Sequence, residues 1–237
     1  MDAGAGIHAH PPRRRVGWAS AAAILAAAVV VGGGVGAVLH LALARSASPR
    51  SALAGSAVHA AAANGLHGQA TWRAGVEPAP AITTLRDQTG HPFSLASLRG
   101  RTVAMTFFDS HCNQACPLEG RALAASERSL AMAQRPVLVA VSVNPRDTSA
   151  SVWAAARKWG LASVGGWHWL MGSNAQLARV WKAYHIFVAP PRNGDISHTE
   201  ALYLIDRRGY ERSGYLYPFV SRYVTLDLRT LASGRMS

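Results

Sequence analysis

The sequence predicts an α/β fold, in which helices flank a mixed central sheet, preceded by a single transmembrane helix near the N-terminus. Three observations support this prediction. Residues 16–44 form a long, uncharged apolar run. From about residue 81, apolar runs of strand length alternate with segments of helical period. A turn ending in Gly209 then separates the last apolar run from a candidate hairpin partner, which makes the sheet mixed.

The composition fits one folded domain with appendages. The chain has 237 residues, of which 49% are hydrophobic and 15% are charged, so it is not disordered as a whole. The formal net charge of +12 comes almost entirely from scattered arginines, since only Lys158 and Lys182 are lysines. No interleaved basic and aromatic motif accompanies this charge. We therefore expect attraction to anionic lipid or to an acidic partner, and no nucleic-acid binding.

The N-terminal apolar run determines the expected compartment. Residues 16–44 contain no Asp, Glu, Lys or Arg, and about 20 apolar residues suffice to cross a membrane. Residues 13–15 are all arginine, so the positive-inside rule keeps residues 1–15 in the cytoplasm and makes the rest extracytoplasmic. The alternative is a signal peptide cleaved after Ala44. Its apolar region would be about twice the usual length, so an uncleaved, single-pass anchor in the cell membrane is favoured.

Residues 45–77 separate this anchor from the rest of the chain. They are rich in Ala, Ser and Gly and lack large aliphatic side chains at a regular period. Such a segment buries too little apolar surface to order itself, so we expect a flexible extracytoplasmic tether. His59 and His67 lie in it, and their side chains are expected to be solvated. The folded domain would then cover residues 78–237.

The folded part is expected to alternate strands and helices. The first two expected strands are continuous apolar runs, as in the buried centre of a sheet. The expected strands are residues 102–108, 137–143, 167–171, 201–205 and 210–215. The expected helices are residues 118–134, 150–159, 174–184 and, more weakly, 217–231.

The two cysteines of the chain, Cys112 and Cys116, follow directly after the first buried strand. Functional groups gather beyond the carboxyl ends of strands in open α/β sheets, which makes the pair a site candidate. If a helix starts at this point, the spacing of four brings both sulfurs towards its N-terminus, where thiol pKa values fall. Two thiolates together with one imidazole would suit copper, because soft thiolates select Cu(I) and imidazole also accepts Cu(II).

A third ligand has to come from one of the ten histidines. His198 stands out because it lies just before the strand expected at residues 201–205. His111 is the competitor, although adjacent residues such as His111 and Cys112 seldom point the same way.

Several segments, in this order, resemble a known family from about residue 80 onward. They are the strand at 102–108, the C-x-x-x-C-P motif at 112–117, the run SVNPRDT at 142–148, WLMG at 169–172 and SHT at 197–199. In these segments the chain resembles the Sco (SenC) family of thioredoxin-fold copper chaperones for cytochrome c oxidase assembly.

The resemblance implies a thioredoxin-like fold for residues 78–237, with copper bound by Cys112, Cys116 and His198. It implies a membrane tether, as the N-terminal anchor suggests, and the copper-centre subunit of cytochrome c oxidase as the recipient. It also implies that the two cysteines can cycle between dithiol and disulfide. Asn144 departs from the family, which usually has Asp at this position. We therefore expect a less negative field near the site.

Other interpretations of the cysteine pair stay open. In a thiol–disulfide oxidoreductase, Cys112 would attack a partner disulfide and Cys116 would resolve the intermediate, and His198 would be dispensable. A peroxidatic cysteine is a third possibility that nothing in the sequence favours. A plain structural disulfide would close a very short loop and add little stability. The resemblance favours a copper chaperone, which needs no catalytic turnover.

Overall fold

The computed structural model describes residues 65–192 and 196–234 of the chain. The predicted cytoplasmic N-terminus, the predicted anchor at residues 16–44 and the tether up to residue 64 lie outside these ranges. Within the described ranges, no helix is long and apolar enough to cross a membrane.

The core of the fold is a six-stranded mixed sheet with the order β1-β6-β5-β2-β3-β4. The strands β2, β3 and β4 are parallel, whereas β5 is antiparallel to β2, β6 to β5 and β1 to β6. The strands are β1 Ala70–Thr71, β2 Val103–Phe108, β3 Val137–Ser142, β4 Trp167–Leu170, β5 Ala201–Ile205 and β6 Glu211–Leu216. The predicted mixed sheet is confirmed, with each of the five expected strands within one or two residues of its predicted bounds.

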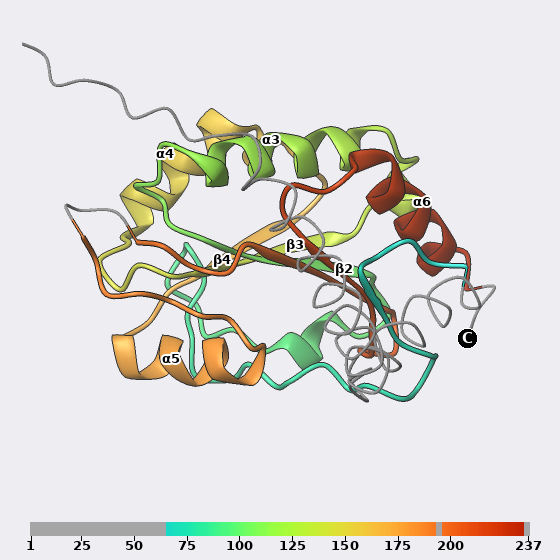
Figure 1. The fold of residues 1–237 in the computed structure, drawn as a ribbon, viewed down its shortest axis with the longest axis horizontal. Helices are drawn as coiled ribbons and strands as arrows, with labels where there is room; N and C mark the ends of the chain where they lie inside the picture. The colour runs from blue at the N-terminus through green and yellow to red at the C-terminus, as the bar shows by residue number, and fades with distance from the viewer. Residues whose placement is uncertain (1–64, 193–195, 235–237) are drawn as a thin grey trace, which may run out of the picture. The chain divides into compact units, whose positions relative to one another are not determined.

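Helices cover both faces of the sheet, with α3, α4 and α6 on one face and α5 on the other (Figure 1). The helices are α3 Ala115–Arg128, α4 Ser149–Trp159, α5 Asn174–Ala183 and α6 Ser221–Ala232. The short 3₁₀ helices are η1 Leu95–Leu98, η2 Met132–Gln134 and η3 Leu161–Ser163. The helix predicted at 118–134 is in fact α3 followed by η2, and α3 begins early enough to include Cys116 and Pro117 in its first turn.

Alternation along the strands divides the interior into two cores. In β2, Met105 and Phe107 point to the core beneath α5, whereas Ala104 and Phe108 point to the core beneath α3, α4 and α6. All six residues of β2 are buried, as are all six of β3. A strand buried on both faces is largely apolar, and the two polar residues of these strands, Thr106 and Ser142, are hydrogen-bonded. The two segments were therefore recognisable in the sequence as nearly continuous apolar runs.

Residues 65–77 pack against the domain, so this part of the tether prediction is wrong. Ala70 pairs with Gly214 of β6, and the side chain of Leu66 is buried in the core beneath α3. A Cβ at Gly68 would overlap Ser213, so glycine permits the close approach of this segment to β6. The pairing uses backbone groups and a single large aliphatic side chain. No apolar period was therefore present in the sequence to reveal it.

Candidate metal centre

Strand pairing brings two distant segments to one edge of the sheet. Because β5 runs antiparallel to β2, with Leu202 opposite Thr106, the residues after β2 lie beside the residues before β5. The first segment carries the two cysteines and the second carries His198. A cavity of about 300 Å³ opens between them, lined by residues of both segments. The site is thus built where β2 ends and β5 begins.

The two cysteines lie together at the start of α3, and both are free thiols. Cys112 is half-buried at the cavity, whereas Cys116 is only 1% exposed. The hydrogen bond from the Cys116 thiol lowers the pKa of Cys112 to about 6. The same bond, together with burial, raises the pKa of Cys116. The pair therefore holds one thiolate, on Cys112, at neutral pH, with a proton retained on the inner sulfur.

His198 presents a ring nitrogen to this pair. Its Nε2 lies 3.7 Å from the Cys116 Sγ, although the two residues are 82 positions apart in the sequence. The His198 Nδ1 donates a hydrogen bond of 3.0 Å to the carbonyl oxygen of Thr199. In the neutral ring this bond places the proton on Nδ1 and leaves the lone pair on Nε2. Burial lowers the pKa of His198, which favours the neutral, metal-binding form.

Glu200 is a further donor that the sequence prediction missed. Ligand atoms of Cys116, His198 and Glu200 all lie within 4.8 Å of one another. Glu200 lies two residues after His198 in extended chain, so the two side chains project to the same side. That spacing could have identified Glu200 from the sequence. Burial and the nearby Cys112 raise the pKa of the Glu200 carboxyl.

Glu119 adds a buried acid behind the cysteines. Its side chain is fully enclosed, one oxygen accepts a 2.6 Å hydrogen bond from the Thr106 hydroxyl, and the other oxygen has no partner. Burial raises the pKa of Glu119 to about 8, and the charges of Glu200 and Cys112 act in the same direction. Glu119 is therefore largely protonated at neutral pH and adds little negative charge to the site.

His111, the competing third ligand, lies in a different cluster. Its Nδ1 is 3.3 Å from an oxygen of Asp147 and 3.5 Å from an oxygen of Asp109. Its side chain is 52% exposed. The structure brings His198, and not His111, next to the sulfur of Cys116.

Asn144 lies close to an acid that the sequence analysis did not connect with it. The Asn144 side-chain amide donates a 3.0 Å hydrogen bond to Asp109, which lines the cavity beside Cys112. Asp109 is 2% exposed, and its charge also acts on Cys112 and His198. Asn144 therefore contacts an acid that lies beside the cysteines, and the effect of Asn144 on the field at the site stays a prediction.

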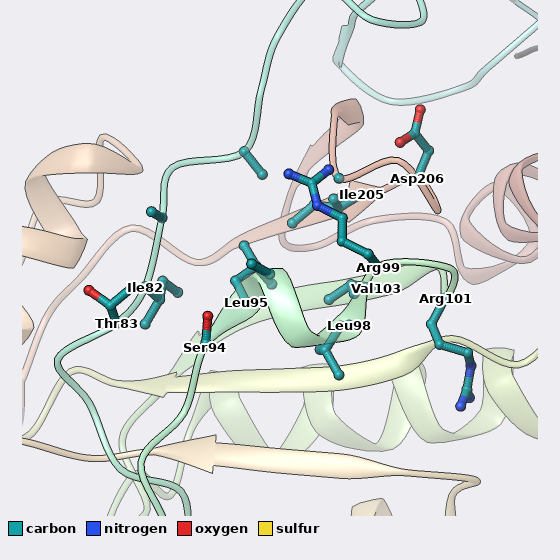
Figure 2. Close-up of a pocket in the computed structure, with 14 residues that line it drawn as sticks. Ile82, Thr83, Ser94, Leu95, Leu98, Arg99, Arg101, Val103, Ile205 and Asp206 are labelled. Carbon is teal, nitrogen blue, oxygen red and sulfur yellow. The ribbon is translucent and has the colours of Figure 1, made fainter.

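A smaller cavity at the opposite end of β2 and β5 lacks such chemistry. It measures about 80 Å³, and its walls are largely apolar, as the side chains of Leu95, Val103 and Ile205 show (Figure 2). Arg99 extends towards Ile205, whereas Arg101 points away. A Cβ at Gly209 would overlap the Arg99 guanidinium, so glycine leaves room for this arginine. None of the described residues that line this cavity is a cysteine or a histidine.

The fold and the site together define a thioredoxin-like domain with two thiols at a helix N-terminus and an imidazole opposite them. The family model for SCO1/SenC matches residues 83–230, which is more than half of the chain. The chain belongs to the SCO1/SenC family, as its motifs had indicated.

Solved structures of family members have the same fold. A SCO1/SenC family lipoprotein from Bacillus anthracis is 24% identical, with a TM-score of 0.58 over 66% of this chain and 95% of that one. ScoI from Bradyrhizobium japonicum, solved with copper bound, is 26% identical, with a TM-score of 0.51 over 65% and 99%. BsSco, described with a disulfide switch, is 19% identical, with a TM-score of 0.54 over 66% and 94%. No curated protein matches the chain.

Proposed function

We propose that this protein is a membrane-tethered, extracytoplasmic copper chaperone. The thiolates of Cys112 and Cys116 and the Nε2 atom of His198 bind the ion. The domain then delivers it to the copper centre of cytochrome c oxidase. The observation that carries the proposal is the 3.7 Å approach of the His198 Nε2 to the Cys116 sulfur, with its lone pair left free.

The donor chemistry supports copper as the cargo. Thiolates are soft ligands that select Cu(I), and imidazole accepts both oxidation states. A closed structural zinc site would usually present four protein ligands of the Cys and His type, whereas this site offers two sulfurs and one imidazole. The copper-bound relative from Bradyrhizobium japonicum supports the same assignment by family membership.

The uncharged run at residues 16–44 supports the tether. With residues 1–15 in the cytoplasm and a single pass through the cell membrane, the domain would face the compartment in which oxidase copper centres are assembled. The Bacillus anthracis relative is a lipoprotein, so a lipid would attach that protein to a membrane in place of a transmembrane helix. The charge of +12 would favour an acidic docking surface on the recipient.

Copper titration of the reduced full chain in detergent tests the proposal. We expect one copper per chain, lost in His198→Ala and in the Cys112→Ser/Cys116→Ser double variant. His111→Ala is the matched control, because His111 adjoins the cysteines but faces Asp109 and Asp147, and it should retain copper. Binding that persists unchanged in His198→Ala would contradict the ligand assignment.

Thiol–disulfide exchange is a second candidate, favoured by the asymmetry of the two cysteines. Cys112 is the accessible thiol with a pKa lowered to about 6, and Cys116 is buried next to it. The Cys112 thiolate would attack a partner disulfide and expel one partner thiolate. Cys116 would then attack the mixed disulfide, releasing the second partner thiol and leaving a Cys112–Cys116 disulfide. Reduction of a partner disulfide that survives His198→Ala would separate this activity from copper binding.

A further inference from the structure

A second large cavity, with a volume of about 450 Å³, lies over β5 and β6 on the face of the sheet that carries α5. Its walls come from the segment after β1, from the end of α5 and from the two strands. It shares no lining residue with the cavity at the cysteines. Its volume lies within the range of about 300 to 1,000 Å³ that is typical of small-molecule sites.

Glu211 is the unusual residue of this cavity. It is 6% exposed, yet among the described residues no group donates a hydrogen bond to its carboxylate and no cation pairs with it. Two other buried acids near β6 are paired: Asp206 binds Arg212, and Asp227 accepts bonds from Ser213 and two other residues. The Glu211 oxygens are not enclosed by protein, so they open into the cavity that this residue lines.

The nearest charge makes the position of Glu211 less favourable still. Glu77, an exposed residue at the rim of the same cavity, is the charged group that acts on Glu211. Burial, and then repulsion by Glu77, raise the pKa of Glu211 to about 7. No Lys or Arg is among the described residues that line this cavity, although His185 also lines it. A positively charged ligand would offset the burial of Glu211 and its repulsion by Glu77.

Aromatic rings form the rest of the recognition surface. The rings of Trp72 and Tyr203 are inclined by only 27°, with centroids 6.4 Å apart. The Tyr203 hydroxyl donates to the carbonyl of Tyr184, and the Tyr184 hydroxyl donates to the carbonyl of Pro80. These bonds fix the tyrosine rings and engage their polar ends. Tyr184 is 1% exposed and packs against Phe107 and Tyr203, so the part-exposed ring of Tyr203, beside Trp72, is the tyrosine surface that a ligand can reach.

The sheet accommodates Trp72 at a glycine. A Cβ at Gly214 would lie only 3.2 Å from the Trp72 ring, so the indole lies directly on β6. Two hydrogen bonds to Arg212 of β6 hold the backbone of Trp72. The Trp72 amide donates to the Arg212 carbonyl, and the Trp72 carbonyl accepts from the Arg212 side chain. The indole is therefore a fixed wall of the cavity.

We propose that this cavity binds an organic cation, an ammonium or guanidinium group, between the aromatic faces and the carboxylates of Glu211 and Glu77. A cation over aromatic rings gains energy from their negative faces, and a partly dehydrated carboxylate strengthens the attraction. A hydrated metal ion fits less well, because hard cations need several oxygen ligands and this wall is mostly aromatic. The cation can belong to a free amine or to a lysine or arginine side chain of a partner protein.

Calorimetric titration of the full chain with choline tests this site. Its neutral isostere, 3,3-dimethyl-1-butanol, has the same shape without the charge. We expect choline to bind and the alcohol not to bind. Glu211→Gln should weaken choline binding at least about tenfold, and Glu77→Gln about threefold, because Glu77 is exposed. Glu127→Gln removes an acid elsewhere and should leave binding unchanged.

Two further arms complete the test. Blocked lysine and blocked arginine amides represent a protein partner, and tighter binding of either than of choline would assign the cation to a partner side chain. The indole NMR signal of Trp72, identified by its loss in Trp72→Phe, should shift on titration. Copper binding and thermal unfolding of Glu211→Gln report whether this variant is folded. Equal binding of choline and the alcohol, or unchanged choline binding in a folded Glu211→Gln, would overturn the proposal.

Discussion

Two polar clusters of this domain differ in how completely their atoms are paired. In the Asp227 cluster, the buried Asp227 carboxylate accepts hydrogen bonds from the His67 backbone and ring, the Ser213 hydroxyl and the Tyr215 hydroxyl. Their lengths lie between 2.6 and 3.0 Å. In the thiol–imidazole site, formed by Cys112, Cys116, His198 and Glu200, three of the four residues line a cavity instead, and the buried Cys116 lies directly behind them.

The difference separates a structural cluster from a binding site. A buried carboxylate with all its lone pairs satisfied stabilises the fold and fixes the segment around His67 against β6 and α6. In the thiol–imidazole site the thiols bond to each other, but the His198 Nε2 and the Glu200 carboxylate keep lone pairs directed at the site. A bound ligand that accepts these lone pairs would explain why the four side chains converge. Substitutions in the first cluster should therefore affect stability, and substitutions in the second should affect binding.

Removal of the inner sulfur should have the largest effect. We expect Cys116→Ala to weaken copper binding about a thousandfold, or about 4 kcal/mol, because a buried thiolate ligand is lost. The free energy of unfolding without copper should fall by only about 1 to 2 kcal/mol, since the substitution is small and the Cys112 thiolate loses one hydrogen bond. Competition titration with a copper chelator and urea denaturation measure the two quantities. A large loss of stability in the metal-free variant would place Cys116 with the structural cluster.

Asp227→Asn should show the opposite pattern. The amide presents a donor to hydrogens from His67, Ser213 or Tyr215, so at least one bond is replaced by an unfavourable contact. We expect the free energy of unfolding to fall by about 2 to 3 kcal/mol, measured in urea. Copper affinity of the folded protein should not change. Weakened copper binding in the folded variant would show that the two clusters are coupled.

The pH dependence of Cys112 provides a third test. A thiolate reacts and a thiol does not, so alkylation by iodoacetamide should rise with pH and reach half its maximum near pH 6. Cys116→Ala removes the hydrogen bond that lowers the pKa, and the midpoint should move up towards about 8.5. The alkylation rate at pH 6 should then fall about tenfold, because the remaining thiolate is scarcer but more nucleophilic. A midpoint that stays near pH 6 would assign the low pKa to another cause.

Glu200→Gln should have the smallest effect, one that depends on oxidation state. A carboxylate is a harder ligand than a thiolate and favours Cu(II) over Cu(I). We expect Cu(II) binding to weaken about tenfold and Cu(I) binding to change by less than about threefold, measured by separate competition titrations. Glu200→Asp keeps the charge but withdraws the oxygens by one methylene, which separates ligation from charge. Equal weakening of both oxidation states would exclude an oxygen ligand selective for Cu(II).

The sequence alone determined the central strands and the position of the cysteines. Each of β2 and β3 is buried on both faces, so nearly every residue is apolar and the strand is visible in the sequence as an apolar run. The spacing of Cys112 and Cys116 is a local property of the start of α3, where Pro117 fits only in a first turn. The choice of His198 over His111 followed from its place before β5 and from the family resemblance.

Only the tertiary structure decided which distant groups meet. Glu200 and Asp109 reach the cavity through the antiparallel pairing of β5 with β2. The order of strands in a sheet cannot be predicted from the sequence of any one strand. The segment around His67 joins the domain through β1 and one buried carboxylate, with almost no apolar pattern. Trp72 and Glu211 likewise meet across β1 and β6. Local periodicity encodes burial and secondary structure, whereas these contacts depend on backbone pairing and single polar atoms.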